Sequence, residues 1–230
     1  MKNLMACDLE VRMFVDSNNL GKRKLLYSGT TKQIYGAGKD TLIMHYPQKL
    51  QNDVWRNHSS SMIWKYLSGM GIKNHFIQKL NLREQLIKAA ETYPVFAKIY
   101  NIVPREMHQR IGIEEGTYFD KPLIEWHFKS KELNDPIVSL EHIKHFNWLE
   151  KTQIEEIQYI TSRANDILQA YFYCHKMRLG DISLEFGKID NKIALIDEIS
   201  PETCNFWSVD VMGQMQKDEV YSVMKNMAKS

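Results

Sequence analysis

Short apolar or β-branched runs separated by glycines fill the first third of the chain. Gly29, Gly36 and Gly38 stand between or beside these runs. Glycine permits tight turns, so the pattern predicts a meander of antiparallel strands. The strands are expected at 24–29, 32–35 and 41–46, with further strands at 75–80, 85–90, 95–103 and 123–128.

Apolar residues at helical spacing predict two helices. Asn57 is the expected N-cap of a helix that Gly69 and Gly71 end. A longer helix is expected from 153 to 177, where Thr152 and Glu155 match a capping box. The stretch 134–140 is expected to be a loop, and the tail from residue 216 a short helix. Strands followed by mixed segments, a long helix and a hairpin indicate the α+β class.

A predicted β-hairpin, 182–189 with 192–199, carries the most informative polar residues. Side chains alternate along a strand, so Asp181, Ser183 and Glu185 share one face. With an odd loop centred on Asp190, Asp197 joins that face; with an even loop it switches to the other.

The odd loop would gather the carboxylates of Asp181, Glu185 and Asp197, which repel one another unless a cation neutralises them. Mg²⁺ with substrate phosphates is one interpretation. A solvated hairpin edge with incidental acids is the other, and the pattern by itself leaves the two even.

The segment 27–32, a glycine turn that ends at Lys32, is a weaker candidate for a phosphate-binding site. Backbone amides at such a turn can bind phosphates, and a lysine can neutralise them. A glycine at a hairpin turn more often has only a conformational role.

Composition narrows the class of protein. The chain has 230 residues, of which 43% are hydrophobic and 25% charged, with a net charge of +2. One large or two small globular domains are expected, without the basic stripe of a nucleic-acid binder. No run approaches 18 apolar residues, so no membrane partner is expected. Three distant cysteines indicate reduced thiols and a cytoplasmic location.

Several residue strings together resemble one family. They follow the order and nearly the spacing of SAICAR synthetase, the phosphoribosylaminoimidazole-succinocarboxamide synthase of purine biosynthesis. The resemblance extends from about Leu25 to Asp218. The strings lie at 27–32, 71–76, 110–116, 128–136, 184–187 and 197–207.

The resemblance implies a two-lobed α+β fold with antiparallel sheets and an ATP cleft between the lobes. The N-terminal, β-rich ATP-binding lobe would span residues 1–88, and the C-terminal lobe with the metal and substrate site 89–230. The implied activity is that of an ATP- and Mg²⁺-dependent ligase. ATP phosphorylates a carboxylate, and an amine such as that of L-aspartate then forms the amide.

The resemblance also implies roles for individual residues. The implied ATP-binding residues are Gly29, Thr30, Thr31, Lys32, Ile87, Lys88 and Ala90. The implied catalytic residues are Lys129, Asp181, Glu185 and Asp197, of which Glu185 and Asp197 would hold Mg²⁺. The implied substrate-binding residues are Tyr100, Asn101, Glu106, Asp135, Asp181, Ser183 and Asn205.

The chain departs from the family pattern mainly at cationic positions. A loop expected between Tyr46 and Asn57 is shortened. Lysines or arginines of the family are replaced by Thr30, Tyr100, Ser183, Asn205 and Tyr221, and a substrate-binding serine is replaced by Glu106. Each charged hydrogen bond is worth about 1.5–3 kcal/mol, so ribotide affinity should fall unless other cations replace the lost ones. The candidates for replacement are Arg56, Arg105 and Arg178.

Three functions fit this pattern. The first is a diverged ligase with an altered substrate, as in nucleoside-type natural-product biosynthesis. The second is a genuine SAICAR synthetase that joins carboxyaminoimidazole ribotide (CAIR) to L-aspartate. The third is a non-catalytic nucleotide-binding protein. The expected partners are a carboxylate-bearing nucleotide or nucleoside, an amine and further copies of the chain, since family members commonly associate.

Overall fold

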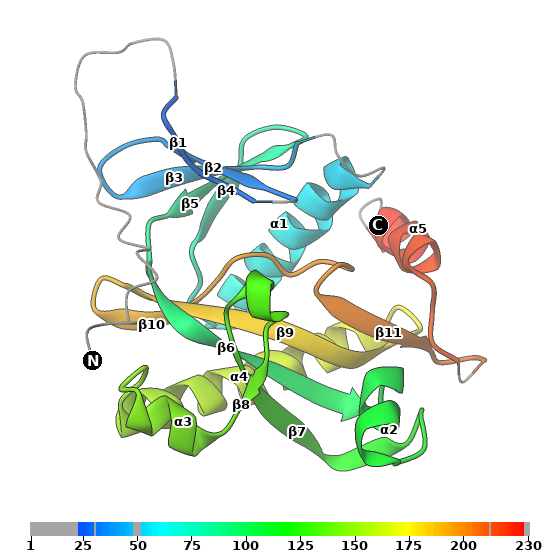
Figure 1. Cartoon of the computed structure of the whole chain (residues 1–230). Coiled ribbons are helices and arrows are strands. Elements are labelled where there is room, and N and C mark those ends of the chain that lie inside the picture. Colours follow the sequence, from blue (N-terminus) through cyan, green and yellow to red (C-terminus); the bar gives the residue numbers. More distant parts are fainter. Residues whose placement is uncertain (1–22, 30, 48–51, 212, 228–230) are drawn as a thin grey trace.

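Two antiparallel sheets lie one above the other in the computed structural model, which describes residues 23–29, 31–47, 52–211 and 213–227 (Figure 1). The first sheet has the order β1-β2-β3-β5-β4. Its strands are β1 Leu25–Ser28, β2 Gln33–Gly36, β3 Thr41–His45, β4 Phe76–Lys79 and β5 Glu84–Lys88. The glycine-punctuated pattern therefore predicted the meander of β1, β2 and β3 correctly.

The second sheet has the order β10-β9-β6-β7-β8, and β11 also pairs with β9. The strands are β6 Glu91–Ile102, β7 Tyr118–Phe128, β8 Ile137–Val138, β9 Met177–Ile189, β10 Lys192–Ile196 and β11 Cys204–Ser208. β8 lies within the stretch expected to be a loop. The long β9 is shared: β10 pairs with its C-terminal half and β11 with its N-terminal half. The segment between β10 and β11 therefore crosses the middle of β9, where the amide of Ser183 donates to the carbonyl of Thr203 at 3.0 Å.

Five α-helices and one 3₁₀ turn complete the described elements: α1 Asp53–Gly69, α2 Arg105–Ile111, η1 Lys131–Leu133, α3 Leu140–His145, α4 Lys151–Tyr173 and α5 Lys217–Met227. The helix at the tail was expected, whereas α2 and α3 were not. None of the helices described is both long and apolar enough to cross a membrane.

Three predicted helix ends were wrong. Asn57 lies inside α1, where its side chain is buried and donates to the carbonyl of Asn81 at 2.9 Å, so it cannot act as the cap. At α4 the capping box is formed by Glu150 and Gln153, two residues before the predicted pair. That helix ends at Tyr173 instead of 177, because Lys176 adopts a left-handed conformation (φ 62°) and β9 begins directly after it.

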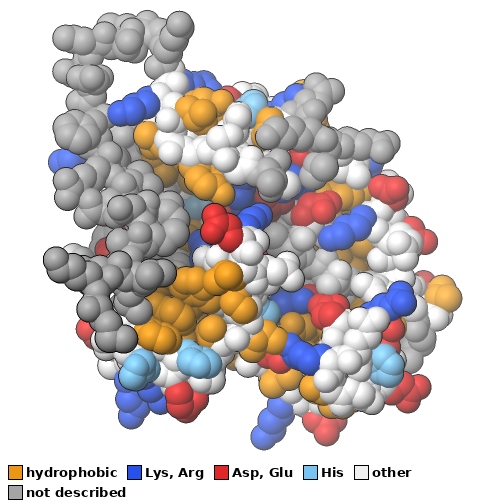
Figure 2. All heavy atoms as spheres, viewed as in Figure 1, with side chains coloured by type: hydrophobic (Ala, Val, Ile, Leu, Met, Phe, Trp, Pro, Cys, Tyr) orange, Lys and Arg blue, Asp and Glu red, His pale blue; other side chains and the backbone are white. Residues whose placement is uncertain are grey.

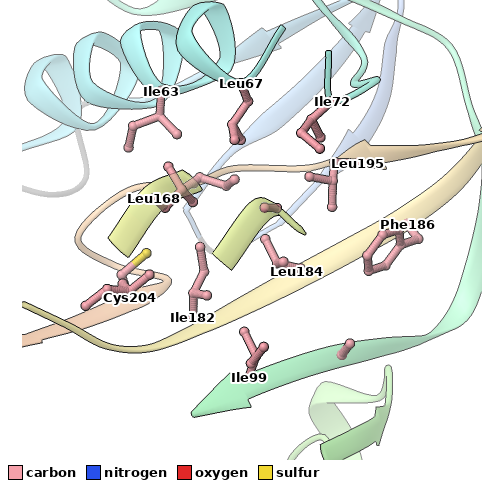
Figure 3. Close-up of a cluster of buried hydrophobic side chains, with 14 of the residues drawn as sticks. Ile63, Leu67, Ile72, Ile99, Leu168, Ile182, Leu184, Phe186, Leu195 and Cys204 are labelled. Atoms are coloured by element: carbon pink, nitrogen blue, oxygen red, sulfur yellow. The ribbon is translucent and has the colours of Figure 1, made fainter. Parts of the chain in front are cut away.

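One apolar core joins helices α1 and α4 to the second sheet. Ile63 and Leu67 of α1 point toward Leu168 of α4 and toward Ile182 and Leu184 of β9 (Figure 3). Although α1 lies between strands of the first sheet in sequence, its buried face therefore packs with residues beyond 88. The division of the chain at 88/89 stays a prediction.

Gly187 of β9 is required by the close approach of the start of β6. A Cβ at this position would lie 2.9 Å from the carbonyl oxygen of Glu91, which is backbone and cannot rotate away. We expect Gly187→Ala to lower the free energy of unfolding by about 1–3 kcal/mol in urea titrations, because overpacking forces the strands apart. Gly69→Ala is the matched control, since a Cβ there meets nothing within 4 Å. Equal stabilities of the two variants would contradict this packing argument.

Candidate functional site

The turn after β10 places the first candidate residue. The hairpin has a two-residue loop, with Ile196 opposite Glu185 and with Asp190 and Asn191 both at positive φ (50° and 60°). Of the two loop lengths that the sequence left open, the even one is therefore formed. Asp197 nevertheless comes close to Glu185, because it leaves the ladder in a left-handed conformation (φ 72°). Aspartate tolerates this conformation better than most residues do, and such backbone strain is frequent at functional sites.

Two lysines and two carboxylates meet at this turn, and we refer to Lys32, Lys129, Glu185 and Asp197 as the charged quartet. Lys32 directly precedes β2, and its Nζ donates to Oδ1 of Asp197. Lys129 directly follows β7, and its Nζ lies 2.6 Å from Oε2 of Glu185. Three segments distant in sequence, one of them the β9–β10 hairpin, thus bring charges of both signs together. Figure 2 shows charged side chains of both signs across the middle of the molecule, between the regions of the two sheets.

Burial and neighbouring charges shift the pKa values of Lys32, Glu185 and Asp197. Burial opposes the charged form of Lys32, but Asp197, Glu198 and Glu185 outweigh it and raise the lysine's pKa. Burial and the neighbouring Asp197 charge raise the pKa of Glu185. The pKa of Asp197 is lowered despite its burial, because Lys32 holds the carboxylate by charge and by a hydrogen bond. Glu185 is therefore the member of the quartet whose charged form is disfavoured, mainly by its burial, and an added cation would favour that form.

Asp181 lies in a second group, apart from the quartet. Its carboxylate is 2% exposed and accepts two hydrogen bonds from Nδ2 of Asn205, at 3.1 and 2.9 Å. Nζ of Lys98 lies 3.4 Å from Asp181 and 2.8 Å from Glu106. The three carboxylates that an odd loop would gather therefore do not come together, because Asp181 is paired here. Across the described part of the chain, no cluster of three or more acidic, histidine or cysteine side chains is placed to hold a metal.

The predicted nucleotide-binding residues have different surroundings. Gly29 and Thr31 flank Thr30, which lies outside the described residues. Ile87 is only 4% exposed and packs with Met44 and Tyr46, so its side chain is part of the core of the first sheet. Lys88 is exposed and forms an ion pair with Asp190 at 3.6 Å. Ala90 is half-buried in the connection from β5 to β6. Contact with a base in this connection would therefore fall mainly to the backbone.

The remaining predicted substrate residues have identifiable partners. Asn101 is 6% exposed, and its amide donates to Asn165 and to the carbonyl of Leu179. Asp135 accepts from the amide of Ser130 at 2.8 Å and so shapes the loop that follows Lys129. Tyr100 is buried, with Nζ of Lys98 4.7 Å from its ring centroid. Ser183 lies opposite Lys98 in the ladder.

The arginines expected to replace the lost cations are engaged elsewhere or lie at the surface. Arg56 is 2% exposed and binds both carboxylate oxygens of Glu198, at 3.0 and 2.7 Å. Arg178 stacks on the rings of Tyr118 and Tyr173. Arg105 is exposed at the first position of α2.

Sequence reasoning missed three residues around the two groups. Lys98 received no role, because nothing in its own strand distinguishes it. Glu198 lies next to Asp197, but its buried partner is more than a hundred residues away in sequence. His75 was noted only as part of a motif. It is buried, and burial is the main cause that lowers its pKa to about 4, so it is a neutral ring next to Asp197 at neutral pH.

Comparisons with known proteins identify the family. The family model described as SAICAR synthetase matches residues 25–230. The chain belongs to the SAICAR synthetase family. A phosphoribosylaminoimidazole-succinocarboxamide synthase of Neorickettsia sennetsu is 45% identical over 165 residues, which are 72% of this chain and 69% of that protein.

Solved structures of the family have the same fold. The phosphoribosylaminoimidazole-succinocarboxamide synthase of Ehrlichia chaffeensis is 32% identical, with a TM-score of 0.83 over 90% of this chain and 97% of that one. A SAICAR synthetase in complex with ADP is 28% identical, with a TM-score of 0.81 over 90% and 96%. The predicted α+β class with antiparallel sheets is confirmed. The predicted enzyme class, an ATP-dependent carbon–nitrogen ligase, is confirmed as well.

Proposed function

We propose that the protein is a SAICAR synthetase, which joins the carboxylate of CAIR to the amine of L-aspartate with consumption of ATP. The charged quartet carries this proposal, because two lysines and two carboxylates meeting at one turn can serve phosphoryl transfer. The 45% identity to the Neorickettsia sennetsu protein supports the same reaction over the altered-substrate interpretation.

Glu185 and Asp197 fit the needs of Mg²⁺. This ion is usually held by one or two carboxylates together with substrate phosphates and water, so a third protein ligand is not required. Burial, and after it the charge of Asp197, raises the pKa of Glu185, so a cation beside both carboxylates would favour their charged forms. When bound, Mg²⁺ would supply charge neutralisation at the ATP phosphates. Glu185 and Asp197 would then exchange their lysine partners for the ion.

Lys32 and Lys129 are the positive groups that would bind the ATP phosphates. Each is held at the turn by a carboxylate, so each can move its ammonium group toward a phosphate without a large rearrangement. Positive groups fixed beside the transferring phosphoryl group stabilise the charge that develops there.

The reaction itself has two steps. A carboxylate oxygen of CAIR attacks the γ-phosphorus of ATP, the bond to the bridging oxygen breaks, and ADP leaves. The amine of L-aspartate then attacks the resulting acyl phosphate and loses a proton, and inorganic phosphate leaves with the electrons of the broken C–O bond. Holding both substrates beside the quartet makes each bimolecular step effectively unimolecular.

A second candidate is a ligase with an altered substrate. Tyr100, Glu106 and Asn205 stand where the family has arginine, serine and arginine, and Asn205 now binds Asp181. Nucleosides without a phosphate are the substrates that this loss of positive charge favours.

A product assay by mass spectrometry tests the two candidates. Purified protein is incubated with Mg²⁺-ATP, L-aspartate and either CAIR or its dephosphorylated nucleoside. We expect ATP-dependent formation of SAICAR from CAIR. Product from the nucleoside alone would support the second candidate, and no product from either by a protein that binds Mg²⁺-ATP would contradict both.

A further inference from the structure

Lys98 is held by two carboxylates that differ in exposure. It lies in β6, which runs between β9 and β7, and its side chain is 16% exposed. Asp181, at 3.4 Å, is 2% exposed, whereas Glu106, at 2.8 Å, is 57% exposed. Asp181 also receives two hydrogen bonds from Asn205. The buried Asp181 is therefore a fixed partner of Lys98, and Glu106 is a partner that water already reaches.

An exposed partner can be exchanged at little cost. Exposed ion pairs contribute only about 0–1 kcal/mol, because solvent screens them. A phosphate or carboxylate that reaches Lys98 has the buried Asp181 behind the ammonium group and needs to displace only Glu106. Lysine is a common ligand of phosphate in proteins. Asp181 and Asn205 therefore position the Lys98 ammonium at the surface of the sheet. Glu106 pairs with that ammonium in the absence of a ligand, and a bound anion would take its place.

The position of Lys98 relates this group to the charged quartet. Lys98 lies opposite Ser183 in the ladder, so both side chains stand on the face that carries Asp181 and Glu185. Ser183 and Glu185 are two residues apart in β9, or roughly 7 Å at about 3.3 Å per residue. A small molecule of nucleotide size spans that interval.

We propose that Lys98 binds the anionic group of the phosphate-bearing ribotide, and that Glu106 competes with this substrate for the same ammonium. The proposal rests on the proposed function and names the residue that replaces the cations missing from the family pattern. It assigns opposite effects to the two residues: Lys98 favours ribotide binding and Glu106 weakens it.

Calorimetric titration with SAICAR, the stable product, tests both effects without turnover. We expect Lys98→Met to raise the dissociation constant about tenfold to a hundredfold, the value of one charged hydrogen bond. Glu106→Gln should lower it about twofold to fivefold, since a competing exposed pair is removed. The double variant Lys98→Val/Ser183→Lys, which moves the ammonium to the facing strand, should recover part of the affinity. Lys144→Met, at an exposed position of α3, should change nothing. Affinity for ATP should stay the same in every variant.

Each outcome of these titrations supports or overturns the proposal. If the wild-type protein binds Mg²⁺-ATP but not SAICAR, the proposed function is wrong and this inference with it. If the wild-type protein binds SAICAR and Lys98→Met binds it equally well, only the inference is overturned. If Lys98→Met does not fold, Glu106→Gln decides: tighter binding supports competition at Lys98, and unchanged or weaker binding overturns it. A merely structural Lys98–Glu106 pair would give no gain on removing Glu106.

Discussion

Asp197→Asn should reduce the rate of ATP-dependent product formation by at least about 10²–10³, the cost of losing one electrostatic group at a transferring phosphoryl centre. The substitution removes the charge that holds Lys32 and is proposed to hold Mg²⁺, while the shape of the side chain is kept. Asparagine also tolerates the left-handed backbone of residue 197 (φ 72°), so the turn should survive. Initial rates of ADP and SAICAR formation at saturating Mg²⁺-ATP give the measurement.

A control variant, Asp210→Asn, distinguishes the loss of a carboxylate at the turn from the loss of a carboxylate elsewhere on the protein. Asp210→Asn removes a carboxylate that is 66% exposed and pairs with Lys176 at 3.8 Å. It should leave the rate unchanged, and both variants should remain folded at the temperature of the assay. If Asp197→Asn kept most of the wild-type rate, the quartet would not be the reaction centre.

Strands were predictable because their signal is local. Alternating apolar residues and glycine turns located the first sheet, and both are properties of neighbouring residues. The register of the β9–β10 hairpin was not predictable in this way. Loops of two and three residues around Asp190 leave apolar partners on both strands, so the pattern could not choose between them. Helix ends were missed for a related reason, since Gln153 and Glu155 are both acceptable at a capping position and only the backbone selects one.

Only part of the candidate site could be predicted from neighbouring residues in the sequence. Glu185 and Asp197 were found because they lie in one hairpin, but the odd loop that would have joined them is not formed, and the left-handed turn brings them together instead. Lys98 could not be found from sequence, because its partner in β9 is more than eighty residues away. The strands β6 and β9 must pair before a lysine of one can face the other. The family pattern was also misleading here. It shows that Ser183 replaces a lysine of the family, but it does not show that Lys98 lies opposite Ser183.

Arg56→Met should destabilise the protein by about 3–5 kcal/mol, because it leaves Glu198 as a buried charge without its main partner. Arg56 and Glu198 are both buried, and the guanidinium also contacts Asp53 at 3.0 Å and the ring of Tyr46 at 5.4 Å. The melting temperature should fall by roughly 6–20 °C, at about 2–4 °C per kcal/mol for a chain of this size. Arg110→Met is the matched control: its pair with Glu125 is partly exposed, and the expected loss is at most about 1 kcal/mol.

A double substitution, Arg56→Met with Glu198→Gln, distinguishes a lost ion pair from lost packing. Removing the buried charge as well should recover part of the stability, because the cost of the single substitution is mainly the unpaired carboxylate. Equal stability of the single and double variants would show that the arginine acts by filling space. The pair joins α1 to the residue next to Asp197, so the recovered double variant should still bind Mg²⁺-ATP more weakly than the wild type. Arg56 is thus expected to stabilise the fold and to hold the turn that carries the candidate metal ligand.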